Sequence, residues 1–83
     1  MEQKIVDING TKYTLQKPDV KSVVGIRSRI LNSGLNSQLV AYEEYMQHIV
    51  VKPKITWEEF EGKLDVLDKI MFEAEEFLYG GKK

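Results

Sequence analysis

The stretch KIVDINGTKYTL, residues 4–15, predicts a β-hairpin near the start of the chain. Asn9-Gly10 separates two short segments in which apolar and polar residues alternate. A type I′ turn favours Asn-Gly because both of its central residues need a positive φ. A loop of two residues also sets the register of the hairpin, so that Val6 should lie opposite Tyr13.

The two faces of this hairpin should differ in polarity. On the outer face Asp7 is expected to pair with Lys12, and Ile5 is the one apolar residue left there. The other face should point into a core, and it carries Val6, Ile8, Tyr13 and Leu15.

Two amphipathic helices are expected after the hairpin. The first spans about 18–32, with Pro18 in its first turn, and it ends before Gly34, which can adopt the left-handed conformation. The second spans about 36–48. Residues 49–51 then form either the end of that helix or a short buried strand, and their β-branched side chains favour the strand. The apolar stripe of the first helix consists of Val20, Val23, Val24, Ile26, Ile30 and Leu31, and the apolar face of the second consists of Leu35, Leu39, Tyr42, Met46 and Ile49.

A third helix is expected over about 57–79, because Thr56-Trp57-Glu58-Glu59 has the pattern of a capping box directly before a long apolar repeat. Trp57, Phe60 and Leu64 should anchor this helix in the core. The apolar positions that follow form a stripe broader than a coiled-coil seam, so part of it could meet a partner. We refer to these residues as the C-terminal stripe, and we expect them to contact another copy or a client protein: Leu67, Ile70, Met71, Ala74, Phe77 and Leu78. The alternative is that this stripe is internal core.

Together these elements predict one α+β domain over residues 1–79, a hairpin packed with three helices and an optional short third strand, followed by a flexible tail at 80–83. A chain of 83 residues without cysteine has one small core and no disulfide to support it. Such a core rarely supplies more than about 3–5 kcal/mol, so association with another subunit is expected. No segment resembles a signal peptide or a membrane span, and the expected location is the cytoplasm.

The sequence offers few groups that could carry catalysis. His48 is the only histidine and there is no cysteine, so His/Cys metal sites and catalytic triads lack parts. The acidic runs at 43–44, 58–61 and 73–76 are expected on exposed helix faces, whereas acid–base catalysis needs carboxylates in a sheltered pocket. Gly80-Gly81 has no helix after it, so it does not form a phosphate-binding loop. We expect no enzyme, cofactor, metal or small-molecule ligand.

A helix-turn-helix is an alternative, because Asn32-Ser33-Gly34 joins two helices and Arg27 and Arg29 could contact phosphate. The second helix argues against it, since residues 36–49 contain two glutamates and neither lysine nor arginine. A pI near 5.8 argues against a nucleic-acid partner as well. Both arginines are expected instead to pair with acids of the third helix or of a neighbouring subunit.

Segments spread over nearly the whole chain carry a further pattern: ING at 8–10, YTLQKP at 13–18, YEEYM at 42–46, HIVVKPK at 48–54, FE at 60–61 and AEEFL at 74–78. Their order resembles that of the tail assembly chaperones of long-tailed bacteriophages and prophages. The resemblance implies a small, mainly helical cytoplasmic protein that self-associates and binds the tape measure protein, keeping it soluble during tail assembly. It also implies absence from the mature virion. The alternatives are a small DNA-binding regulator and a structural virion component.

Overall fold

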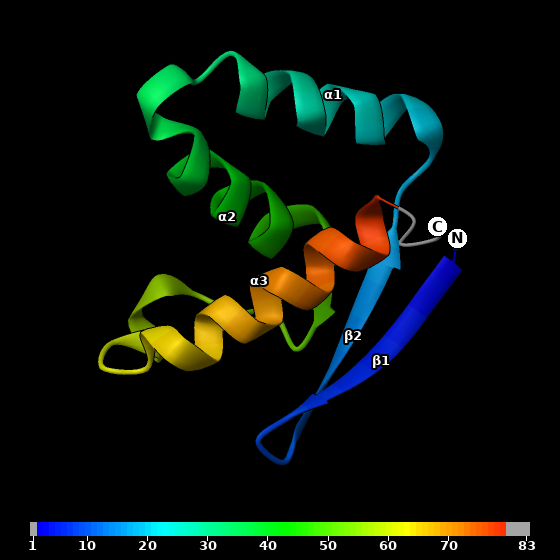
Figure 1. The fold of residues 1–83 in the computed structure, drawn as a ribbon. Coiled ribbons are helices and arrows are strands. Elements are labelled where there is room, and N and C mark those ends of the chain that lie inside the picture. Colours follow the sequence, from blue (N-terminus) through cyan, green and yellow to red (C-terminus); the bar gives the residue numbers. More distant parts are fainter. Residues whose placement is uncertain (1, 80–83) are drawn as a thin grey trace.

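The computed structural model describes residues 2–79, and over these residues it shows three α-helices and a three-stranded antiparallel sheet (Figure 1). The expected α+β fold is therefore confirmed. The expected tail at 80–83 lies outside the described residues. The elements, in chain order, are β1 (Glu2–Ile8), β2 (Thr11–Lys17), α1 (Val20–Leu31), α2 (Ser37–His48), β3 (Val50–Lys52) and α3 (Leu64–Leu78). Short 3-10 helices at Gly34–Asn36 and Trp57–Phe60 precede α2 and α3.

The hairpin forms as its sequence predicts. Asn9 and Gly10 both have positive φ, at 53° and 90°, and the expected register is present with Asp7 opposite Lys12. The Asp7 carboxylate accepts a hydrogen bond from the Gly10 N–H at 2.9 Å and another from the Lys12 ammonium at 3.3 Å. Ile5 is exposed on the outer face, whereas the expected inner-face residues are buried: Val6, Ile8, Tyr13 and Leu15.

The third strand is also confirmed. Val50–Lys52 pairs antiparallel with β2, with Val50 opposite Leu15, and the sheet order is β1-β2-β3. The Gln16 N–H donates to the Ile49 carbonyl at 2.8 Å. Ile49 and Val50 are completely buried, so this segment joins the centre of the core and does not continue α2.

The expected single helix over 57–79 is wrong, because the chain breaks after Phe60 and starts α3 only at Leu64. The capping box is present, with the Thr56 N–H donating to the Glu59 carboxylate at 2.7 Å, but it caps a single 3-10 turn. Gly62 follows with a φ of +76°. Glycine weakens a helix by about 1 kcal/mol, and its positive φ is incompatible with a continuous right-handed helix.

This break changes which side chains anchor the core. Of the three expected anchors only Phe60 is buried; Trp57 and Leu64 are exposed. Trp57 stacks instead on Tyr42 of α2, with ring centroids 6.4 Å apart. The seven-residue spacing that included Trp57 and Leu64 therefore spans two elements that do not share one helical face.

α1 begins two residues later than expected. Asp19 is its N-cap, accepting hydrogen bonds from the Ser22 N–H at 3.4 Å and the Ser22 hydroxyl at 2.7 Å, and Pro18 lies just before it. Gly34 has the expected left-handed conformation, with a φ of 60°.

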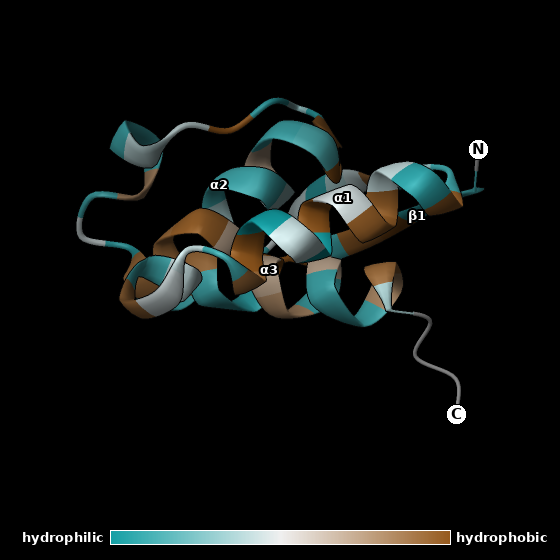
Figure 2. Ribbon diagram, turned by 90° about the horizontal axis from the view of Figure 1, so that it is seen from above, coloured by the Kyte–Doolittle hydropathy of each residue, from teal (hydrophilic) through white to brown (hydrophobic). Residues whose placement is uncertain are grey.

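The core lies between the inner face of the sheet and the helices α2 and α3, and α1 packs chiefly against α2 (Figure 1). In the view from above, hydrophobic positions recur along α1 (Figure 2). The largest side chains with almost no exposed area are Leu15, Ile26, Ile49, Val50, Ile70 and Met71.

Candidate functional site

The C-terminal stripe lies mostly in the core of the folded chain. Leu67, Ile70, Met71, Ala74 and Leu78 are each no more than 4% exposed, and only Phe77 is half-buried. A partner could contact the five buried residues only if α3 left the sheet, which would dismantle the core. The structure therefore places this stripe in the internal core, and a contact surface must be sought elsewhere.

Apolar side chains are exposed on α1 and around the turn that joins it to α2. Leu31 is 73% exposed and Leu35 is fully exposed. We name this set the limb surface, and it consists of Val20, Val24, Leu31, Leu35 and Leu39. All five belong to the apolar stripes that the sequence predicts, but the fold leaves them exposed.

The geometry of α1 explains why part of its apolar stripe is exposed. Val23, Ile26 and Ile30 pack toward the core, whereas Val20, Val24 and Leu31 are exposed. At about 100° per residue, the second group lies on a side of the helix roughly 100° away from the first. Because α1 packs chiefly on α2, only one of these two apolar sides is covered.

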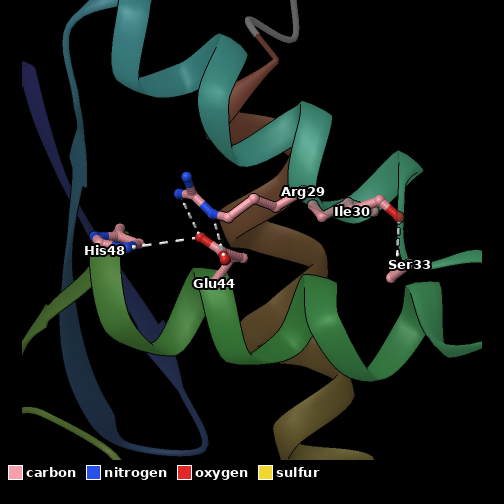
Figure 3. Close-up of polar contacts among 5 residues, drawn as sticks. All are labelled: Arg29, Ile30, Ser33, Glu44 and His48. Carbon is pink, nitrogen blue, oxygen red and sulfur yellow. Dashed lines mark hydrogen bonds and ion pairs between the residues drawn. The ribbon is translucent and has the colours of Figure 1, made fainter.

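A polar cluster joins α1 to α2 (Figure 3). Arg29 donates through Nε and Nη2 to the two carboxylate oxygens of Glu44, at 2.8 and 2.9 Å. His48 Nε2 lies 3.6 Å from Glu44 Oε1. At the end of α1 the Ser33 hydroxyl donates to the Ile30 carbonyl at 2.5 Å. Arg29 therefore pairs with the second helix, whereas an acid of the third helix or of a neighbouring subunit had been expected.

The electrostatics of the cluster are those of a structural link. Only 13% of the Glu44 side chain is exposed, so its expected position on a solvated helix face is wrong. The hydrogen bonds from Arg29 lower the pKa of Glu44 and raise the pKa of Arg29. The bidentate geometry fixes both side chains, and it holds α1 against α2.

An open groove of about 500 Å³ adjoins this cluster, between the N-terminal half of α1 and the end of β2. Lys21, Gly25, Arg29 and His48 are among its lining residues. The Glu44 carboxylate is already engaged by Arg29, so it is poorly placed to act as a base in this groove. Among the described residues there is no group of three or more His, Cys, Asp or Glu side chains that could hold a metal ion.

Tyrosines connect α2 to α3, and the sequence analysis did not assign them this role. Tyr42 donates to the Asp68 carboxylate at 2.6 Å, and burial together with this hydrogen bond raises the pKa of Tyr42 to about 12. Burial, followed by a hydrogen bond with Tyr79, raises the pKa of Tyr45. Arg27 lies over the Tyr79 ring, 5.4 Å from its centroid, where an acid had been expected.

Comparisons of the chain with models of protein families, with curated proteins and with solved structures found no match. No helix within residues 2–79 has the length and apolar character needed to cross a membrane.

Proposed function

We propose that this protein is a non-catalytic tail assembly chaperone of a long-tailed bacteriophage or prophage. In this proposal it self-associates in the cytoplasm of the bacterial host, binds the tape measure protein and keeps it soluble, and is absent from the mature virion. The observation that supports the proposal is the limb surface, because a chaperone of an apolar client needs exposed apolar side chains in its own folded state.

The chemistry of the limb surface suits an amphipathic helix. Leu35 and Leu39 are four residues apart, Leu35 in the 3-10 helix Gly34–Asn36 and Leu39 in the first turn of α2, which follows it directly. Two exposed leucines at this spacing suit the apolar face of a client helix. Fully burying a leucine side chain contributes about 1.5–3 kcal/mol, so a few such contacts would hold a client reversibly. The exposed cations Lys21 and Arg27 on α1 would favour a client helix with acidic residues beside its apolar face.

The DNA-binding alternative gains no support from the site. The helix that would enter the major groove is α2, and its sequence SQLVAYEEYMQH contains neither lysine nor arginine. Arg29, one of the two expected phosphate contacts, is engaged by Glu44.

Co-expression with a tape measure protein, taken from the phage or prophage that encodes the chain, tests the proposal. The wild-type chain should raise the soluble fraction of the tape measure protein, and the double variant Leu35→Ser, Leu39→Ser should not. The matched control is Leu64→Ser, Phe72→Ser, which removes two exposed apolar side chains of α3 outside the limb surface. Circular dichroism should show that both double variants remain folded.

Two results would contradict different parts of the proposal. If the wild-type chain left the tape measure protein insoluble, the proposed function would be wrong. If the double variant Leu35→Ser, Leu39→Ser kept as much tape measure protein soluble as the α3 control variant did, the client would bind at another surface.

A further inference from the structure

β1 is an edge strand whose outer side has no partner within residues 2–79 (Figure 1). The two-residue turn makes Ile8 and Thr11 the closing hydrogen-bonded pair of the hairpin, and such pairs recur at every second residue. The backbone groups of Gln3, Ile5 and Asp7 therefore point away from β2, toward the open edge.

Natural sheets usually protect such an edge with charged side chains. Glu2 and Lys4 are the charged residues on the inner face of β1, and the Lys4 ammonium lies 3.8 Å from the Glu73 carboxylate of α3. The middle residue of the seven-residue strand is Ile5, which is 64% exposed on the outer face. An isoleucine at the centre of an open edge favours strand pairing.

We propose that two copies of the chain pair through their β1 strands, antiparallel and about a two-fold axis at Ile5. The two sheets then form one continuous sheet of twice the width. In this register the whole strand is paired: Ile5 faces Ile5 of the second copy, Gln3 faces Asp7, Lys4 faces Val6 and Glu2 faces Ile8. The two isoleucines cover each other, and no like charges stand directly opposite.

The neighbouring registers are less favourable because of the side chains that they place opposite each other. A two-fold axis at Lys4 would place two lysines opposite each other, and an axis at Asp7 would place two aspartates opposite each other. An axis at Val6 would set the exposed Ile5 against Asp7. Each of these shifts also leaves part of the strand without a partner.

The inner side of the edge offers a second complementary contact. Ile8, Asp68, Lys69 and Glu73 line an open groove of about 410 Å³ between β1 and α3. Asp68 accepts a hydrogen bond from Tyr42 and Glu73 lies 3.8 Å from the Lys4 ammonium, so both acids already have a partner. In the central register Glu2 of the second copy lies beside Ile8 on this inner face. Its carboxylate then meets the Lys69 ammonium, and the two-fold axis repeats the contact on the other copy.

This pairing rests on one part of the proposed function, self-association, for which it names the surface; it does not depend on the client-binding part. The α1–α2 turn and β1 lie at opposite sides of the molecule (Figure 1), so a β1-paired dimer leaves uncovered the part of the limb surface at this turn, which carries Leu31, Leu35 and Leu39. The β1 edge and the limb surface can therefore be tested separately.

Disulfide trapping tests the pairing directly, because the chain contains no cysteine. Hydrogen-bonded residues of an antiparallel pair have Cα atoms about 5.5 Å apart, which lies within the range that a disulfide spans. Under mild oxidation Ile5→Cys should form a covalent dimer on a non-reducing gel. Gln3→Cys alone and Asp7→Cys alone should stay monomeric on that gel, whereas a mixture of the two should form the dimer.

The control for random collision is Lys12→Cys, an exposed position on the same outer face but on the strand without a free edge. Light scattering coupled to size exclusion adds a measurement without oxidation: the wild-type chain should elute as a dimer or a multiple of it, and Ile5→Lys should lower that mass where Lys12→Ala does not. A wild-type monomer, cross-linking of Ile5→Cys no faster than Lys12→Cys, or equal self-linking of Gln3→Cys and Ile5→Cys would each overturn the proposal.

Discussion

α1 and α3 were both predicted from apolar periodicity, yet the two helices are buried to different extents in the folded chain. α3 lies across β1 and β2 beside α2, and it buries five side chains to 4% exposure or less. α1 packs chiefly on α2 and buries only Ile26. A periodic apolar pattern therefore shows that a helix has an apolar side, whereas the number of neighbouring elements decides whether that side is covered.

The largest expected change in stability comes from a substitution in α3, and it is tested by comparing two positions that are close in sequence. Ile70→Ala should lower the free energy of unfolding by about 2–5 kcal/mol, because it leaves a cavity in a closely packed core. Phe72→Ala removes a larger but exposed side chain, and it should change stability by no more than about 0.5 kcal/mol. Urea unfolding followed by circular dichroism measures both. Similar losses for the two variants would mean that the α3 stripe is not the internal core.

The sequence predicted those parts of the fold that depend on local chemistry. Asn9-Gly10 determined the hairpin and its register, and the β-branched run before Pro53 indicated the third strand. Both signals act within a few residues, and they did not depend on which elements would meet in space.

The parts that were missed depend on contacts between elements or on competing local signals. The pairing of Arg29 with Glu44 requires the angle between α1 and α2, which no spacing within either helix specifies. Gly62 was present in the sequence, but the capping box and the apolar repeat around it both favoured a continuous helix. The exposure of Leu35 follows from the lack of a neighbour at that turn, which a single sequence does not encode locally.

A smaller loss of stability should follow when the ion pair that links α1 to α2 is removed. Glu44→Gln replaces a carboxylate that accepts two hydrogen bonds from Arg29, and it should cost about 1 kcal/mol at neutral pH. Because the folded pKa of Glu44 is lowered, the stabilisation is complete above the ordinary carboxyl pKa of about 4.3 and is lost as the pH falls through the lowered value. The difference between wild type and variant should therefore shrink in acid.

Urea unfolding at about pH 7 and at about pH 3 measures this difference. Other carboxylates titrate in the same range, among them Asp19, whose pKa is lowered by hydrogen bonds from Ser22. The contribution of Glu44 is therefore taken from the difference in unfolding free energy between the Glu44→Gln variant and wild type at each pH. Glu43→Gln, at an exposed position of the same helix, is the control and should show no such dependence on pH. If the difference in unfolding free energy between wild type and Glu44→Gln were the same at both pH values, the ion pair would not stabilise the packing of α1 on α2.

The smallest expected change is a gain in stability, and it concerns α1, the helix with the fewest neighbouring elements. Gly25 lies inside α1, and an added Cβ there would meet only the Arg29 side chain, at an ordinary 3.5 Å. Alanine favours a helix interior over glycine by about 0.5–1 kcal/mol, so Gly25→Ala should stabilise the chain by up to that amount. Gly62→Ala is the matched comparison: its surroundings are equally open, but its φ of +76° should make alanine destabilising by about 1 kcal/mol. Thermal unfolding compares the two variants. If Gly25→Ala left stability unchanged while Gly62→Ala lowered it, α1 would already be frayed in the folded chain, and the contrast between α1 and α3 would be one of local stability as well as of burial.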